Sequence, residues 1–355
     1  MILKKLSKSS LIFREIIENN TKKNLKLSVL ATRALIRYSL RIFSLNFSKI
    51  LLKQYLILYK IIFFKKKIYE KYILQINIFR IDCRILFADK KLDEYVKKRI
   101  EWANFILSNS LSKEEKNAAL QYLRILNIFG YYKKKILASS VKTSKVKKNK
   151  KKLYIYGPNS AFPPNPKYFK YTIVLTKMID FDISNFKDSI LILNHFTSNQ
   201  LTEQNERLLL KKYNKIYLST SKKKIKYPFK KFYKEKDIGG HIASSMALGR
   251  ILNRLSNLYP NAEFIIEGFD FYLSKNAYNK YITTGYPLKF NQLTEYLICQ
   301  SIFDHEPLFN FLYVKNITSK LKIKDSHKFI EIMKLSGYQY LKRLSKIRNC
   351  YSLTL

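Results

Sequence analysis

Two stretches of the 355-residue sequence combine glycines with small polar residues in a way that suits an anionic ligand. The stretch "LYIYGPNS" ends in a tight turn whose free backbone N–H groups, with the side chains of Asn159 and Ser160, could hold the sugar or phosphate of a nucleotide. The stretch "GGHIASS" places Ser244 and Ser245 at the start of an expected helix, where exposed amides and the helix dipole favour an anion. Each stretch alone is also an ordinary turn or helix cap.

A third stretch, "IIEGFDFYLSKNAY", has more functional residues than a turn needs. Gly268 follows an apolar run directly, Asp270 is flanked by aromatic residues, and Tyr272 and Tyr278 are six positions apart. A transition from strand to turn requires the glycine and the aspartate but not the two tyrosines. The stretch is therefore a candidate site.

The elements around these stretches read as alternating strands and helices. Short apolar runs such as "YTIVLTK", "DSILILNHF" and "NKIYLSTS" do not alternate with polar residues, which is typical of a parallel sheet covered on both faces. The ligand loops of such a sheet lie at the carboxyl ends of its strands. We therefore expect an α/β domain with a Rossmann-like, mostly parallel sheet over 153–355.

The order of these motifs resembles the bacterial sialyltransferases that extend lipooligosaccharide. That family carries a G-N-G-P-S turn after the first strand, an I-T-S-G helix start, and a strand ending in S-G-I-D-F-Y with a second tyrosine six residues on. The resemblance covers residues 153–320 and extends distantly to the sialyl motifs of the animal-type enzymes. The chain departs from the pattern at Ser245, where the family has glycine, at His241, where it has arginine, and in the spacing of the Gly157-Pro158-Asn159 turn.

The resemblance implies a Rossmann-like glycosyltransferase that moves sialic acid from CMP-sialic acid to a glycan acceptor, inverts the anomeric centre and needs no metal or other cofactor. His305 would be the catalytic base, and Tyr272 and Tyr278 would donate hydrogen bonds to the departing phosphate. The residues implied in donor binding are Gly157, Asn159, Ser160, Asn194, Ser244, Ser245 and Asp270.

Elementary chemistry agrees with these roles. Negative charge develops on the leaving phosphate, so two phenolic donors can act where other enzymes use a metal ion. The acceptor hydroxyl must lose a proton, which suits a histidine with an ordinary pKa of about 6.5. The stretch "FDHEPLFNFLYVKNI" reads as a helix opened by Asp304, whose dipole favours the neutral form of His305, with Glu306 partly opposing it. His195 is the second candidate base.

Several alternatives stay open at the site. The departures from the family pattern fit a different CMP-linked ulosonic acid, such as Kdo or a legionaminic-type sugar. Asp180 and Asp182 match the D-x-D of metal-dependent glycosyltransferases but fit a turn at a strand edge better. The residues leave open the acceptor, the linkage formed, and whether the protein is a monomer or a homo-oligomer.

Residues 1–137 are expected to form a basic, all-helical domain, because proline is absent and apolar residues recur at helical spacing. In "LSKEEKNAALQYLRILNIFG", Ser112 and Glu115 form a predicted capping box, a stripe runs from Ala119 to Leu126, and Gly130 stands at the C-cap. The segment 138–152 is small, polar and cationic, which indicates a linker.

The formal net charge of +43 is concentrated in the first 152 residues. Lys, Asn, Ile, Tyr and Phe are abundant together, as AT-rich codons would give, so we attribute part of the charge to composition. A solvated lysine-rich face without a partner is one interpretation. A surface of this kind otherwise suits an anionic membrane, an acidic glycan or nucleic acid.

Three scattered cysteines fit a reducing cytoplasm, and no stretch reaches the ~18 apolar residues of a spanning helix. We expect a cytoplasmic enzyme in peripheral contact with the inner face of the membrane. A nucleic-acid-binding protein is the alternative, against which stands the lack of an RRM, KH or helix-turn-helix signature.

Overall fold

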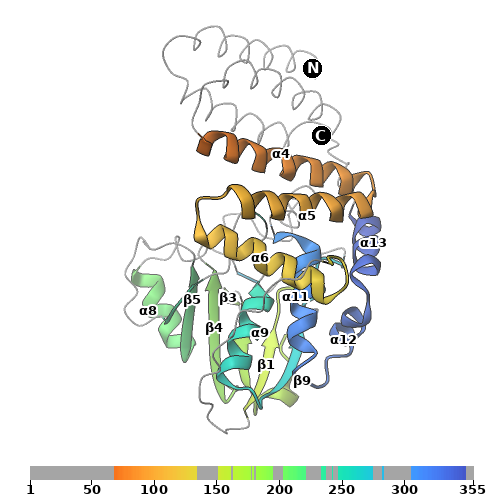
Figure 1. The fold of residues 1–355 in the computed structure, drawn as a ribbon. Coiled ribbons are helices and arrows are strands. Elements are labelled where there is room, and N and C mark those ends of the chain that lie inside the picture. Colours follow the sequence, from red (N-terminus) through yellow and green to blue (C-terminus); the bar gives the residue numbers. More distant parts are fainter. Residues whose placement is uncertain are drawn as a thin grey trace, which may run out of the picture. The chain divides into compact units, whose positions relative to one another are not determined.

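The computed structural model describes a little over half of the chain, in segments that include most of the expected α/β half (Figure 1). The described residues are 68–133, 151–160, 163–176, 178–179, 181–194, 203–220, 233–236, 242, 247–274, 282–283 and 305–348. All of the predicted helical region before residue 68, and the predicted linker up to residue 150, therefore lie outside the described residues.

Seven strands of the described chain form one sheet in which every neighbouring pair is parallel. In order across the sheet they are β6 (Tyr233–Lys236), β5 (Lys215–Thr220), β4 (Asp188–Asn194), β2 (Thr172–Leu175), β1 (Lys152–Tyr156), β7 (Glu263–Glu267) and β9 (Lys322–Ile323). A second, two-stranded sheet pairs β3 (Met178–Ile179) antiparallel with β8 (Ile282–Thr283). The predicted α/β architecture is confirmed.

The inner strand β1 is buried on both faces of the sheet, as is usual for a parallel sheet whose crossover helices cover both sides. Successive residues of β1 alternate between two cores, with Leu153 and Ile155 in one core and Tyr154 and Tyr156 in the other. All four of these side chains are buried, as the run without polar alternation predicts.

Helices cover both faces of this sheet (Figure 1). One face packs on α9 (Ala247–Leu258) and α11 (Pro307–Thr318), which lie side by side, and the other packs on α8 (Glu203–Lys212) and the short helix η1 (Pro166–Tyr168). Gly249 of α9 allows the close approach of α11, because a Cβ there would lie 2.8 Å from the ring of Tyr313.

Three further helices, α4 (Ile68–Ala88), α5 (Leu92–Asn109) and α6 (Lys113–Ile128), precede the sheet in the chain. Helix α6 matches its prediction closely. Its apolar stripe is buried, the Ser112 side chain accepts from Glu115 N, and Gly130 follows the C-cap residue with φ +78°. The second half of the predicted capping box is wrong, because the Glu115 carboxylate accepts instead from the hydroxyls of Ser110, at 2.6 Å, and Tyr72.

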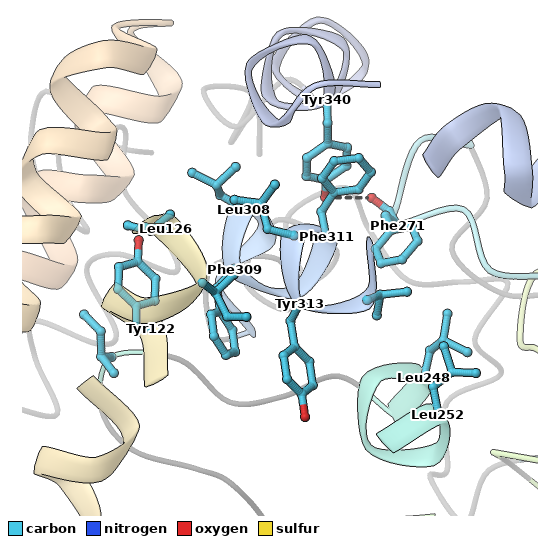
Figure 2. Close-up of a cluster of buried hydrophobic side chains, with 14 of the residues drawn as sticks. Tyr122, Leu126, Leu248, Leu252, Phe271, Leu308, Phe309, Phe311, Tyr313 and Tyr340 are labelled. Carbon is cyan, nitrogen blue, oxygen red and sulfur yellow. Dashed lines mark hydrogen bonds between the residues drawn. The ribbon is translucent and has the colours of Figure 1, made fainter. Parts of the chain in front are cut away.

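Helices from both ends of the described chain share one apolar core with the sheet (Figure 2). The ring of Tyr122 on α6 stacks on Phe309 of α11, with centroids 5.6 Å apart. On the other side of α11, Phe311 stacks at 4.4 Å on Tyr340 of α13 (Gly337–Ile347), which α12 (His327–Lys334) precedes. Residues from Tyr72 to Cys350 accordingly form one compact unit. The domain boundary at 138–152 stays a prediction, since most of that segment is not described.

Within the described residues, none of the helices has the length and apolar character needed to cross a membrane.

Candidate functional site

The chain reverses its direction of travel across the sheet between β1 and β7. From β1 it proceeds outward through β2, β4, β5 and β6, and it then returns to place β7 on the opposite side of β1. In an open parallel sheet, such a point leaves a crevice at the carboxyl ends of the two strands, where ligands bind. The turns that follow β1 and β7 are the ones that the sequence marks with "GPNS" and "EGFDFY".

These two turns are bonded to each other beyond the ends of the strands. Gly157 N donates to Glu267 O at 2.7 Å, and Asn159 N donates to Gly268 O at 2.9 Å. The close approach requires glycine at both positions. A Cβ on Gly157 would lie 2.4 Å from the Phe269 ring, and one on Gly268, where φ is +74°, would lie 2.6 Å from Ser160 N.

Asn159 and Asp270 meet at the centre of this pair of turns. Asn159 Nδ2 donates to one carboxylate oxygen of Asp270 at 2.5 Å, and Tyr272 N donates to the other at 3.1 Å. Asp270 is only 7% exposed. The carboxylate therefore joins both turns and caps the second one, which is the organising role expected for it.

Ser160 and Glu267 complete the polar groups of this edge. Ser160 is 2% exposed and its hydroxyl donates to Gly157 O at 3.2 Å, so it shapes the first turn from within. The Glu267 carboxylate accepts from the Tyr154 hydroxyl at 2.5 Å. Sequence reasoning did not select Glu267, although it stands directly before Gly268 in the marked motif.

The turn after β7 has a strained backbone that residues from the C-terminal end of the chain hold in place. Phe271 and Tyr272 have φ values of +54° and +66°, a region that side chains other than glycine rarely adopt. The Tyr340 hydroxyl donates to Phe271 O at 3.1 Å (Figure 2). The Arg348 guanidinium donates to Tyr272 O at 3.1 Å and to Ser274 O. No sequence signal pointed to Arg348, because its partners are backbone atoms more than 70 residues away.

His305 lies toward the same edge of the sheet. Residues 319–321 join α11 to β9, so the C-terminus of α11 lies at the amino edge and its N-terminus points to the carboxyl edge. Phe311 of α11 packs edge-to-face on Phe271, with centroids 5.6 Å apart, and His305 precedes Phe311 by six residues. The backbone carbonyl of His305 accepts from the Asn310 side chain.

The prediction that Asp304 opens this helix is wrong. The N-cap of α11 is Glu306, with φ +51°, and its carboxylate accepts from Phe309 N. The Glu306 side chain is fully buried and also accepts from the Tyr95 hydroxyl of α5 at 2.6 Å. The N-cap carboxylate of α11 therefore also has a tertiary partner, and Asp304 lies outside the described residues.

A buried arginine of α5 completes this network. Arg99 Nε lies 3.7 Å from Glu306 Oε1, and its guanidinium stacks 4.5 Å from the Trp102 ring. Burial opposes the charge on Arg99, but Glu306 and then Tyr95 outweigh that effect and raise its pKa, so the guanidinium stays protonated. Burial and then Glu306 raise the pKa of Tyr95 well above its ordinary value, which keeps the phenol a hydrogen-bond donor.

Several predicted residues are not placed. Asn194 ends β4 at the carboxyl edge, but its side chain is not described. Tyr278, Ser244, Ser245, His195, His241 and Asp180 lie outside the described residues.

Asp182 and the fourth histidine, His327, have local surroundings. His327 is the exposed first residue of α12, and the Asp182 carboxylate accepts from Ser184 N at 2.9 Å in a local turn. Among the described residues, no group of three or more His, Cys, Asp or Glu side chains could hold a metal ion.

Comparison of the chain with protein-family models, with curated proteins and with solved structures found no match.

Proposed function

We propose that this protein is a Rossmann-like glycosyltransferase that moves a CMP-activated ulosonic acid, sialic acid in the first place, to a glycan acceptor with inversion and without a metal ion. The observation that carries the proposal is the hydrogen bond between Asn159 and Asp270. It joins the two sequence motifs of the resemblance at the point where a parallel sheet binds its ligands.

The roles of the individual residues follow from the chemistry of the transfer. The paired turns after β1 and β7 bind the nucleotide part of the donor. Asn159 and Asp270 hold the shape of these two turns. Tyr272 and Tyr278 donate to the phosphate as charge develops on it. His305 removes the proton of the acceptor hydroxyl as that oxygen attacks the anomeric carbon and the bond to CMP breaks.

The setting of the strained turn supports Tyr272 in this role. Positive φ values at two successive residues are maintained only where the surroundings over-determine them, and such strain gathers at functional sites. Here the Asp270 carboxylate, the Tyr340 hydroxyl and the Arg348 guanidinium all act on the backbone of one five-residue turn. A tyrosine held so firmly can be aimed at a ligand without losing much conformational entropy on binding.

The basic N-terminal residues supply the remaining part of the proposal. They hold the enzyme in the cytoplasm near the anionic inner face of the membrane or near an acidic acceptor. The charge is screened by salt, so membrane binding weakens as ionic strength rises.

A direct assay tests the proposal. The purified protein is incubated with CMP-sialic acid and a galactose-terminated acceptor, with CMP-Kdo as a parallel donor, and both transferred sugar and released CMP are measured. We expect transfer from one of the two donors in the presence of EDTA. Absence of transfer and of CMP release with these and other CMP-ulosonic donors would exclude the proposal. A salt-dependent shift of DNA, together with no thermal shift in CMP, would favour the nucleic-acid-binding alternative.

A further inference from the structure

Arg99 of α5 contacts two segments that are distant from it and from each other in the chain. Its Nη2 donates to the backbone carbonyl of Ile242, and its Nε lies 3.7 Å from the Glu306 carboxylate. Arg99 is 3% exposed and Glu306 is fully buried. Both contacts are therefore shielded from water, which strengthens the hydrogen bond to Ile242 and the ion pair with Glu306 and makes their loss costly.

The Glu306 contact acts on the backbone of His305. Glu306 follows His305 directly, has φ +51°, and caps α11 through Phe309 N. The Asn310 side chain bonds the carbonyls of both His305 and Glu306, the latter at 3.0 Å. The orientation of His305 is thus coupled to the position of the Glu306 carboxylate, which Arg99 and Tyr95 hold from the opposite helix.

The Ile242 contact acts on the segment that leads into α9. Ile242 is 1% exposed and precedes the first residue of α9, Ala247, by five positions. Arg99 therefore ties α5 to the backbone at Ile242.

We infer that Arg99 is a positioning residue of the proposed transferase, which holds the base segment at His305 and the backbone of Ile242 in one fixed relation to α5. The inference rests on the proposed function and adds a component from α5, which lies outside the region of the family resemblance. An arginine suits this role because two of its nitrogens face the two partners at once, Nη2 the Ile242 carbonyl and Nε the Glu306 carboxylate. A lysine carries its charge on one nitrogen and cannot reproduce that arrangement.

The kinetic test compares Arg99→Lys with Arg254→Lys. Arg254 is a matched control, since it also lies on a helix of the same compact unit and packs on an aromatic ring, that of Tyr217, at 4.7 Å. We expect Arg99→Lys to lower kcat by about tenfold to a hundredfold, because small displacements of reacting groups have effects of this size. Arg254→Lys is expected to retain wild-type kinetics. Equal kinetics for Arg99→Lys and wild type would overturn the inference.

A second measurement separates this inference from the proposed function. Hydrogen–deuterium exchange is followed by mass spectrometry on peptides that contain Ile242 and Phe309, in the absence of any substrate. We expect Arg99→Lys to exchange faster than wild type in both peptides, and Arg254→Lys to match wild type. If the wild type shows no transferase activity, this result still decides whether Arg99 couples the two segments. Unchanged exchange in both peptides would overturn the coupling.

A milder variant covers the case in which Arg99→Lys does not fold. Tyr95→Phe removes only the hydroxyl that donates to Glu306 and keeps the ring that packs on Phe87 at 5.6 Å. We expect it to lower kcat by about twofold to tenfold and to speed exchange in the peptide that contains Phe309. Wild-type values of both quantities in Tyr95→Phe would overturn the inference.

Discussion

Asn159 and Asp270 are separated by 111 residues in the chain, yet the Asn159 amide donates to the Asp270 carboxylate at 2.5 Å. The parallel pairing of β1 with β7 brings them together, since both turns leave the sheet at the same edge. The carboxylate also caps its own turn at Tyr272 N. One buried side chain therefore connects the two motifs that define the candidate site.

Asp270→Ala is expected to destabilise the protein by roughly 2–3 kcal/mol, because it leaves the Asn159 amide and Tyr272 N without their acceptor in a buried place. CMP affinity is expected to fall with it. Asp182→Ala is the control, because that exposed carboxylate caps only a local turn at Ser184. Urea denaturation measures the free energy of unfolding, and calorimetry measures the affinity for CMP. Equal losses in the two variants would contradict a special role for Asp270.

Gly268→Ala and Gly130→Ala test the close approach of the two turns. Both glycines have positive φ, +74° and +78°, but a Cβ on Gly268 would collide with backbone atoms of Ser160 and Gly157, whereas a Cβ on Gly130 meets nothing within 4 Å. We expect a loss of about 1 kcal/mol for Gly130→Ala and roughly 2–4 kcal/mol for Gly268→Ala. Chemical denaturation provides both values, and similar losses would show that the turns can separate freely.

Arg348→Ala is expected to weaken the hold on the strained turn that follows β7. It removes the donor to Tyr272 O and Ser274 O, which we expect to lower stability by roughly 2–3 kcal/mol and to weaken CMP binding. Arg343→Ala on the same helix, α13, is exposed and is expected to stay within about 0.5 kcal/mol of wild type. Thermal unfolding with and without CMP measures both effects. A wild-type CMP-induced shift in Arg348→Ala would separate this arginine from the site.

His305→Ala tests the proposed base. We expect kcat to fall by about 10²- to 10⁴-fold, while the affinity for CMP stays within about threefold of wild type, since the base acts on the acceptor and not on the nucleotide. His327→Ala, at the exposed start of α12, is the matched control and is expected to keep full activity. An active His305→Ala enzyme would remove His305 from its role.

Glu263→Gln is expected to have a pH-dependent effect on stability. The hydrogen bond from Lys324, at 2.9 Å, lowers the pKa of Glu263, and the hydroxyl of Tyr171 bonds the same carboxylate at 3.2 Å. A carboxyl whose pKa is lowered by folding stabilises the protein above its unfolded pKa of about 4.3, and this contribution disappears as the pH falls through the lower folded value. Glu263→Gln is therefore expected to lower Tm by roughly 1–3 °C at pH 7, with the difference closing toward pH 3. Glu331→Gln, at an exposed pair with Lys334, is expected to show little difference at either pH.

The parts of the fold that have a local signature could be predicted from the sequence. Runs such as 153–156, apolar on both faces, predict a buried parallel strand, and Ser112 and Gly130 mark the two ends of α6. The paired turns could also be expected to share one edge, because carboxyl ends of parallel strands do. These features depend on neighbouring residues or on a general rule of topology.

The contacts that position the candidate site have no such signature. Arg99 and Arg348 bond backbone carbonyls, which every residue carries, so their side chains give no hint of the partner. The N-cap of α11 is Glu306, whose carboxylate also contacts Tyr95 and Arg99, about 200 residues earlier in the chain. Contacts at that separation leave no trace in the local pattern from which a helix cap is predicted.

The pairing of Tyr95 with Glu306 has a consequence for biosynthesis. The two residues are 211 positions apart, so at roughly 5–20 residues per second a ribosome makes the second about 10–40 s after the first. During that time, α5 and α6 lack α11, the helix that covers their apolar faces, and β1 lacks its neighbouring strand β7. The nascent chain therefore completes this part of its native core only after Glu306 has emerged, and until then the apolar faces of α5 and α6 lack their native cover.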